Sequence, residues 1–153
     1  MRKGLISLMM LTVGLGSVQA KSNFTGTWKM DPAKSDLRSG PAPEARLDRI
    51  SYEEPNLKDT ITQSMRGRES TYDMNYLTDG TETTNSVRGN QMKSVARWEG
   101  DELVVDTKGS VAGRGVTFKD RWSISPDGKT LTLRRHLNTP LGEGDQTLVF
   151  DRQ

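Results

Sequence analysis

Turn-forming residues recur at short intervals along this chain, and their spacing constrains the fold more than any other feature. Eight such turns follow Leu47: Glu54-Pro55-Asn56, Gly67, Asp79-Gly80, Gly89-Asn90, Gly100-Asp101, Gly113-Arg114-Gly115, Pro126-Asp127-Gly128 and Gly142-Glu143-Gly144. No helical periodicity lies between them, and strands spaced by about 8–12 residues are typical of all-β barrels and sandwiches. Because short connections pair neighbouring strands, we expect an antiparallel up-and-down meander of nine or ten strands.

The first strand is predicted within the stretch from Phe24 to Asp31. Phe24, Gly26, Trp28 and Met30 fall on one face, and the threonines and the lysine between them fall on the other. This period of two is the pattern of a half-buried strand.

Two hairpins can be predicted residue by residue. A two-residue turn at Gly100-Asp101 places Trp98 opposite Leu103 and Met92 opposite Gly109, so that the two apolar faces coincide. A slip of one residue would turn the whole set to solvent, and the coincidence therefore supports this register. In the next hairpin, a turn at Asp127-Gly128 places Asp120 directly opposite Arg135, each among apolar neighbours; a four-residue turn would move them apart by one pair.

The remaining segments are less regular. Tyr72, Met74 and Tyr76 alternate before Asp79-Gly80 and predict a third hairpin, but residues 81–86 contain no apolar side chain and fit an edge or exposed strand. Residues 31–36 are predicted as one helical turn, and residues 32–45 as the longest loop, because their prolines and glycines neither continue a helix nor join a central strand. The last strand is predicted over 146–152.

Residues 1–20 have the pattern of a secretory signal peptide. Arg2 and Lys3 precede an apolar run from Leu5 to Leu15, and Val18-Gln19-Ala20 fits a cleavage site. We therefore expect cleavage after Ala20, export to the periplasm or the extracellular space, a single domain over residues 21–153, and no membrane span after cleavage.

The mature chain is electrostatically neutral and poor in apolar residues. Removing Arg2 and Lys3 reduces the 22 basic residues to 20, against 20 acidic ones, so no net positive charge favours nucleic acid or anionic lipid as a partner. Only 38 of its 133 residues are apolar, about 29% against a usual 45–50%. Such a composition fits strands that bury one side each or an interior that is partly polar. A single meandering sheet must also hide its edges, and closure into a barrel does so.

The opening motif resembles that of a known fold family. Gly26-Thr27-Trp28 on the first strand, the meander, and an arginine at the end of the last strand together resemble the lipocalin-like (calycin) barrels, specifically small secreted bacterial ones. The resemblance implies that Trp28 closes one end of the barrel and that Arg152, or alternatively Arg134, lies over its ring in a cation–π contact. The chain departs from typical lipocalins because it shows no C-terminal helix and no cysteine, and residues 32–45 do not fit the helical lid of fatty-acid-binding barrels.

We predict a binding site for a small amphipathic or anionic hydrophobic molecule inside the barrel. An inward arginine can bind a carboxylate or phosphate group, and an acidic partner can orient it when the site is empty. Aromatic and methionine side chains on inward faces would line the wall. The candidate ligand-binding residues are Asp120, Arg135, Tyr72, Met92, Trp98, Phe118 and Trp122; the candidate barrel-end residues are Gly26, Trp28 and Arg152.

Catalysis, metals and cofactors are not expected. The chain has no cysteine and one histidine, His136, whose predicted face is outward, which argues against a zinc site, thiol catalysis and a serine–histidine–acid arrangement. Two alternatives to a monomeric binding protein stay open. One is an interaction module with a filled barrel and an exposed apolar patch, and the other is an enzyme that uses a free Asp120 as general base.

Overall fold

The computed structural model describes residues 21–153, so the predicted signal peptide lies outside the described residues. The described part of the chain forms ten β-strands and no helix. The strands are β1 (Gly26–Met30), β2 (Ala45–Glu53), β3 (Asn56–Met65), β4 (Arg68–Leu77), β5 (Thr83–Val87), β6 (Asn90–Glu99), β7 (Glu102–Val111), β8 (Arg114–Ile124), β9 (Thr130–Thr139) and β10 (Gly142–Arg152).

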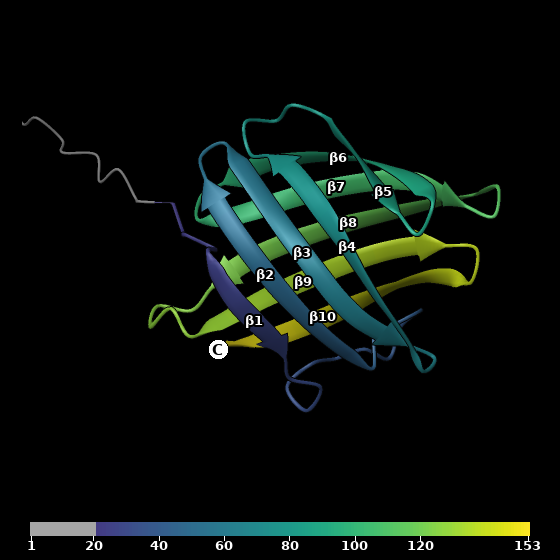
Figure 1. Cartoon of the computed structure of the whole chain (residues 1–153), viewed down its shortest axis with the longest axis horizontal. Coiled ribbons are helices and arrows are strands. Elements are labelled where there is room, and N and C mark those ends of the chain that lie inside the picture. The colour runs from purple at the N-terminus through teal and green to yellow at the C-terminus, as the bar shows by residue number, and fades with distance from the viewer. Residues whose placement is uncertain (1–20) are drawn as a thin grey trace, which may run out of the picture.

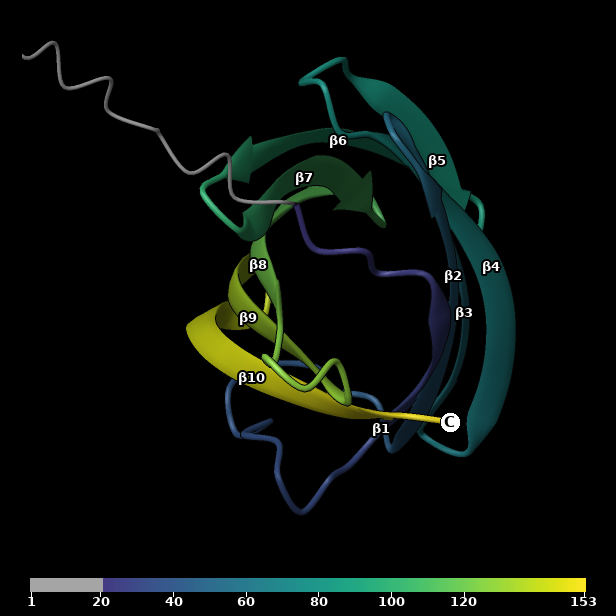
Figure 2. The same cartoon turned by 90° about the vertical axis from the view of Figure 1, so that its left-hand side faces the viewer.

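The ten strands form one antiparallel sheet in the order β4-β3-β2-β1-β10-β9-β8-β7-β6-β5 (Figure 1). The first and last strands of the chain are neighbours, with Trp28 opposite Arg152. Viewed from one end, the strands surround a common interior (Figure 2). The prediction of an all-β meander of nine or ten strands is therefore confirmed.

The barrel is nearly closed rather than fully closed, because β4 and β5 are the two edges of the sheet. The hairpin predicted at Asp79-Gly80 is therefore wrong, although residues 81–86 do contribute the predicted edge strand. Instead of a ladder, Asn85 of β5 joins β4 through its side chain. The Asn75 N–H donates to the Asn85 carboxamide oxygen at 2.7 Å, and the Asn85 amide nitrogen donates to the Asn75 carbonyl at 3.0 Å.

Both residue-level hairpin predictions hold. Trp98 pairs with Leu103 and Met92 pairs with Gly109 across the β6–β7 hairpin. In the β8–β9 hairpin, Asp120 pairs with Arg135. One apolar face of each strand thus turns inward, and the two charges turn inward with it.

The last turn lies elsewhere than predicted, whereas the first loop begins with the predicted single turn. The β9–β10 turn lies at Pro140-Leu141, two residues before the predicted Gly142-Glu143-Gly144, which instead begins β10. Gly144 faces Ser39 of the loop between β1 and β2. A Cβ at Gly144 would lie 2.6 Å from the Ser39 Cβ, so the glycine permits a close approach rather than a turn. Residues 31–36 contain one hydrogen-bonded turn, over residues 32–34, that does not continue as a helix, and the Asp31 carboxylate accepts a bond from the Ala33 N–H at 2.9 Å.

The loop between β1 and β2 packs against the barrel. It pairs with β10 where β1 has ended, through two backbone bonds between Asp36 and Thr147 of 2.8 and 2.9 Å. The Gln146 amide donates to the carbonyls of Ser39 and Pro41. The predicted long loop is thus an ordered cover, fixed to β10 at several points.

One end of the barrel, which we call the aromatic end, is filled by the side chains of Phe24, Trp28, Tyr52, Trp98 and Trp122. The segment before β1 crosses this end (purple in Figure 2). Its Phe24 is fully buried and lies 5.7 Å from the rings of both Trp98 and Trp122 and 6.5 Å from that of Tyr52.

The Trp28 side chain belongs to the same end and is also fully buried. The Arg152 guanidinium lies over the Trp28 ring, 4.1 Å from its centroid, and donates to the Thr25 and Gly128 carbonyls. Gly26 makes this possible, because a Cβ there would overlap the guanidinium. The contact expected from the resemblance is therefore present. The alternative, Arg134, bonds Glu102 instead, at 2.7 Å.

Candidate functional site

Polar and charged side chains occupy much of the barrel's middle. They lie on the inward faces, where the period of two also places the apolar core. The buried polar residues of the described chain are Arg46, Asp48, Asp59, Gln63, Thr78, Asn85, Ser94, Thr107, Asp120 and Gln146. We call the group formed by Arg46, Asp48, Asp59, Tyr72, Tyr76, Asp120 and Arg135 the polar middle. The low fraction of apolar residues in the sequence thus corresponds to an interior that is partly polar.

The first ion pair of the polar middle joins β8 and β9. Arg135 Nε donates to Asp120 Oδ1 at 2.7 Å, and Nη2 donates to Oδ2 at 2.8 Å. The guanidinium also lies 5.0 Å from the centroid of the Phe118 ring. Burial lowers the pKa of Arg135, but the neighbouring Asp120 carboxylate raises it overall. Nη1 takes no part in this bidentate pair, and the Arg135 side chain is 21% exposed, so it is accessible to a ligand.

The second ion pair lies on β2 and is more deeply buried. Arg46 Nε and Nη2 donate to the two Asp48 oxygens, each at 2.7 Å. Burial disfavours the charge of Arg46, but Asp48 outweighs this and raises its pKa. On the neighbouring strand β3, the nearest Asp59 oxygen is 3.9 Å from Arg46 Nη2, which is too far for a hydrogen bond. Three carboxyl groups therefore share two arginines in this interior.

Two tyrosines of β4 connect the ion pairs. Burial raises the pKa of the Tyr72 hydroxyl, while the positive charges of Arg46 and Arg135 act against it. Burial, followed by the charges of Asp59 and Asp120, also raises the pKa of Tyr76. Each hydroxyl thus lies within electrostatic reach of both ion pairs, and together with Arg135 they offer donors to an anionic group.

The structure divides the predicted ligand-binding residues between two regions. Asp120, Arg135 and Tyr72 belong to the polar middle, and the Phe118 ring lies against the Arg135 guanidinium. Trp98 and Trp122 lie at the aromatic end. Met92 is buried on β6 opposite Asn85 of β5, next to the opening between the edge strands β4 and β5, which we call the seam. Their binding roles stay predictions.

Sequence reasoning missed Arg46, Asp48 and Asp59. The signal was present, because Leu57, Asp59, Ile61 and Gln63 alternate like the face that contains Asp120. On β2, however, charges occupy both faces, and pattern alone does not decide which face turns inward.

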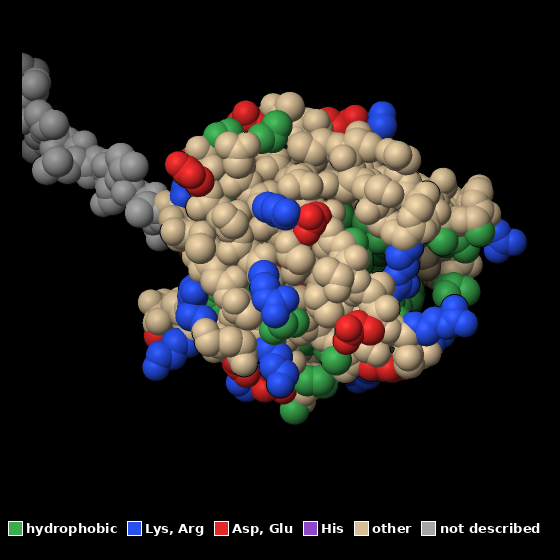
Figure 3. Space-filling model, in the orientation of Figure 1, with side chains coloured by type: hydrophobic (Ala, Val, Ile, Leu, Met, Phe, Trp, Pro, Cys, Tyr) green, Lys and Arg blue, Asp and Glu red, His purple; other side chains and the backbone are tan. Residues whose placement is uncertain are grey.

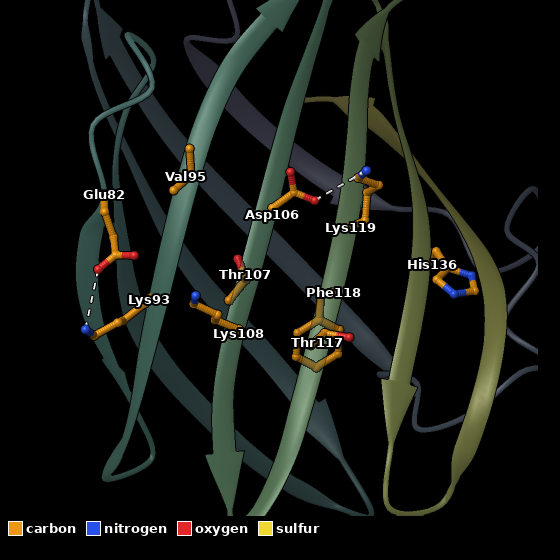
Figure 4. Close-up of a pocket in the computed structure, with 10 residues that line it drawn as sticks. All are labelled: Glu82, Lys93, Val95, Asp106, Thr107, Lys108, Thr117, Phe118, Lys119 and His136. Atoms are coloured by element: carbon orange, nitrogen blue, oxygen red, sulfur yellow. Dashed lines mark ion pairs between the residues drawn. The ribbon is translucent and has the colours of Figure 1, made fainter.

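Two hollows on the surface of residues 21–153 are large enough for a small molecule, and the Arg135 side chain lines neither of them. The first, of about 410 Å³, lies on the outer face of β6–β9 (Figure 4). Lys93 pairs with Glu82 at 3.5 Å, and Lys119 pairs with Asp106 at 3.7 Å, so both signs of charge line it. The second, of about 440 Å³, lies beside Arg152 at the aromatic end.

The space-filling view shows a further depression at the seam. Hydrophobic side chains are visible inside it, with Lys or Arg side chains beside it, where β4 and β5 diverge (Figure 3). The seam therefore brings apolar interior surface close to solvent.

Residues 21–153 contain no cluster of three or more histidine, cysteine or acidic side chains suited to a metal ion. Within the same range, no helix has the length and apolar character needed to cross a membrane.

Known structures share this fold at low sequence identity. An SAHS protein from Ramazzottius varieornatus has a TM-score of 0.64 and 14% identity, over 85% of this chain and 95% of that one. The zebrafish ileal bile acid-binding protein, in complex with cholic acid, has a TM-score of 0.58 and 15% identity, over 85% and 98%. No family model and no curated protein sequence match this chain. These likenesses define the class of fold, a ten-stranded, nearly closed, calycin-like barrel.

Proposed function

We propose that this protein binds a small amphipathic molecule with an anionic head group inside the barrel and does not act on it chemically. The observation that carries the proposal is Arg135. Its guanidinium faces the interior, is partly exposed, and retains one nitrogen outside its pair with Asp120. Charge-assisted bonds to carboxylate, sulfonate or phosphate oxygens are the strongest that such a group makes.

The surroundings of Arg135 suit the two parts of such a ligand. The Tyr72 hydroxyl lies near Arg135 and would add a donor to the head group. Phe118, Met74 and Met92 provide apolar and adaptable surface for a tail. Binding sites of small molecules commonly combine a mainly apolar wall with a few polar groups that orient the ligand. A similar barrel solved with cholic acid adds support from the shared fold.

The two alternatives have less support. An interaction surface of standard size contains about 20–30 residues a side, whereas the large hydrophobic side chains exposed in residues 21–153 are Val111 and Leu141, on two hairpin tips. A general base at position 120 would require a free carboxylate, but both Asp120 oxygens accept bonds from Arg135.

Two experiments test the proposal. Native mass spectrometry of the protein purified from its own source should detect a co-purifying small molecule. Isothermal titration calorimetry with decane-1-sulfonate should then show binding that Arg135→Met weakens at least tenfold. Arg134→Met is the matched control, because Arg134 is the adjacent residue on the outer face of β9 and should leave the affinity unchanged. Equal loss in both variants, or no binding by the wild type, would refute the proposal.

We also propose that the protein acts as a monomer after export to the periplasm or the extracellular medium. The signal-peptide pattern of residues 1–20 supports export. Sequencing the N-terminus of the native protein should give Lys21 as the first residue, and a chain that begins at Met1 in the cytoplasm would contradict export. Sedimentation velocity of the purified protein should give one species of monomer mass.

A further inference from the structure

Asp59 is a fully buried carboxyl group in the middle of the barrel. In the described part of the chain, no N–H or O–H group donates a hydrogen bond to either of its oxygens, and the side chain within hydrogen-bond reach is the Asp48 carboxyl group. The residues opposite it on β2 and β4 are Ile50 and Met74, which are both apolar. A buried ionised carboxylate in such surroundings is strongly unfavourable, and the protonated form is then preferred.

The charges around Asp59 do not compensate for its ionisation. From β2, Arg46 is engaged by Asp48, and its Nη2 stays 3.9 Å away from Asp59. From β4, Tyr76 packs nearby and Asp73 acts as a second negative charge. Across the interior, Arg135 is engaged by Asp120. Burial, and then the charge of Asp48, raise the pKa of Asp59 well above its ordinary value.

We propose that ligand binding in the polar middle is coupled to the protonation of Asp59, so that the anionic head group binds tightly while Asp59 is protonated and weakly once it has ionised. The inference rests on the proposed function and names its regulation. With Asp59 protonated, Arg46 and Arg135 balance Asp48 and Asp120, and the interior accepts one further negative charge. Ionised Asp59 supplies that charge itself and repels the ligand.

The direction of the pH dependence follows from linkage. A bound anion favours the protonated form of Asp59, so the complex holds its proton to higher pH than the free protein does. Between these two pKa values, binding takes up a proton from solvent and the dissociation constant rises with pH, by up to tenfold per pH unit. Outside this window, the affinity is independent of pH.

Folding stability should follow the same group. In an unfolded chain Asp59 titrates near its ordinary value of 3.8, and in the folded protein it titrates higher. The folded state therefore binds more protons, and its stability falls as the pH rises from about 3.8 through the native pKa of Asp59. In Asp59→Asn, which places a neutral side chain of the same shape there, this loss should be absent.

Decane-1-sulfonate is a suitable probe, because its charge does not change with pH. Calorimetry from pH 4 to 9, in buffers of different ionisation enthalpy, measures both affinity and proton uptake. We expect the wild type to lose affinity with rising pH and to take up as much as one proton on binding. Asp59→Asn should keep the low-pH affinity throughout and take up no proton, and decan-1-ol should show no pH dependence. Asp101→Asn, on an exposed turn, is the matched control and should behave like the wild type.

The outcomes separate this inference from the proposed function. If the wild type does not bind the sulfonate at any pH, both fail. If it binds with constant affinity, or if Asp59→Asn keeps the same proton uptake, only the coupling is refuted. Should Asp59→Asn fail to fold, the carbon-13 shift of the Asp59 carboxyl in the wild type decides, because an ionised carboxylate at pH 5 would overturn the proposal.

Discussion

The aromatic end and the polar middle both consist of side chains that turn into the barrel, yet they affect the protein in opposite ways. At the aromatic end, Phe24, Trp28 and Trp122 are at most 2% exposed and pack against one another or against Arg152. In the polar middle, Arg46 and Asp59 are also buried, at 5% and 0% exposure, but carry ionisable groups. Apolar burial stabilises the fold, whereas removing charges from water costs free energy that ion pairing only partly recovers.

This contrast separates the region that determines stability from the region in which we propose binding. A chain with so few apolar residues retains two arginines and three aspartates at interior positions, where apolar side chains of similar size would usually be at least as stable. We therefore expect the aromatic end to account for stability, and the polar middle is the region in which we propose a ligand.

The largest expected effect is that of Trp28→Ala. Deleting a fully buried indole removes its apolar burial and leaves a cavity, so the free energy of unfolding should fall by about 3–5 kcal/mol. Urea denaturation monitored by circular dichroism measures this change. The folded fraction should still bind decane-1-sulfonate with wild-type affinity, because Trp28 lies outside the polar middle.

Trp28→Phe is the control for this variant, since it keeps a ring beneath Arg152 and should lose less stability. Loss of binding in a Trp28→Ala protein of unchanged stability would reverse the comparison. It would mean that the ligand enters at the aromatic end.

The second effect is that of breaking the Arg135–Asp120 pair from one side. Asp120→Ala leaves the Arg135 charge without its partner in a largely buried position. Because the Arg135 side chain is 21% exposed, we expect a loss near or below the lower limit for buried pairs, about 2–3 kcal/mol by urea denaturation.

Removing both charges should recover most of this loss. In Asp120→Ala/Arg135→Met, we expect stability within about 1 kcal/mol of the wild type, since no unpaired charge stays buried. Sulfonate binding should nevertheless be lost. A double variant that is as unstable as the single one would show that the pair itself stabilises the barrel.

The sequence predicts those parts of the fold that depend on local geometry. The period of two and a turn centred on Asp127-Gly128 together fix the pairing of Asp120 with Arg135. The same reasoning fixes Trp98 opposite Leu103. Both rely on neighbours in the chain, and a register error would expose a whole apolar face.

The parts that the sequence does not predict depend on non-local pairing. Closure of the meander predicts that β1 and β10 pair, as they do, but it does not predict that the sheet stays open between β4 and β5. The two side-chain bonds from Asn85 to the backbone of β4 can be recognised only when β4 is known to lie beside β5. Similarly, Arg46 and Asp48 turn inward because β1 and β3 fix the face of β2, which contains charges on both sides.

The smallest expected effect comes from an ion pair of the same chemistry on the outer face. Arg97 Nη1 lies 2.7 Å from Asp106 Oδ2, the distance also found between Arg135 Nε and Asp120 Oδ1, but both outer side chains are 41% exposed. Water and salt screen such a pair, so Asp106→Ala should cost less than about 1 kcal/mol, and added salt should reduce the cost further. Double-mutant cycles on the outer and inner pairs measure the two coupling energies directly. Equal coupling energies would mean that burial does not distinguish the polar middle from the surface, and that the inner pair is as well solvated as the outer one.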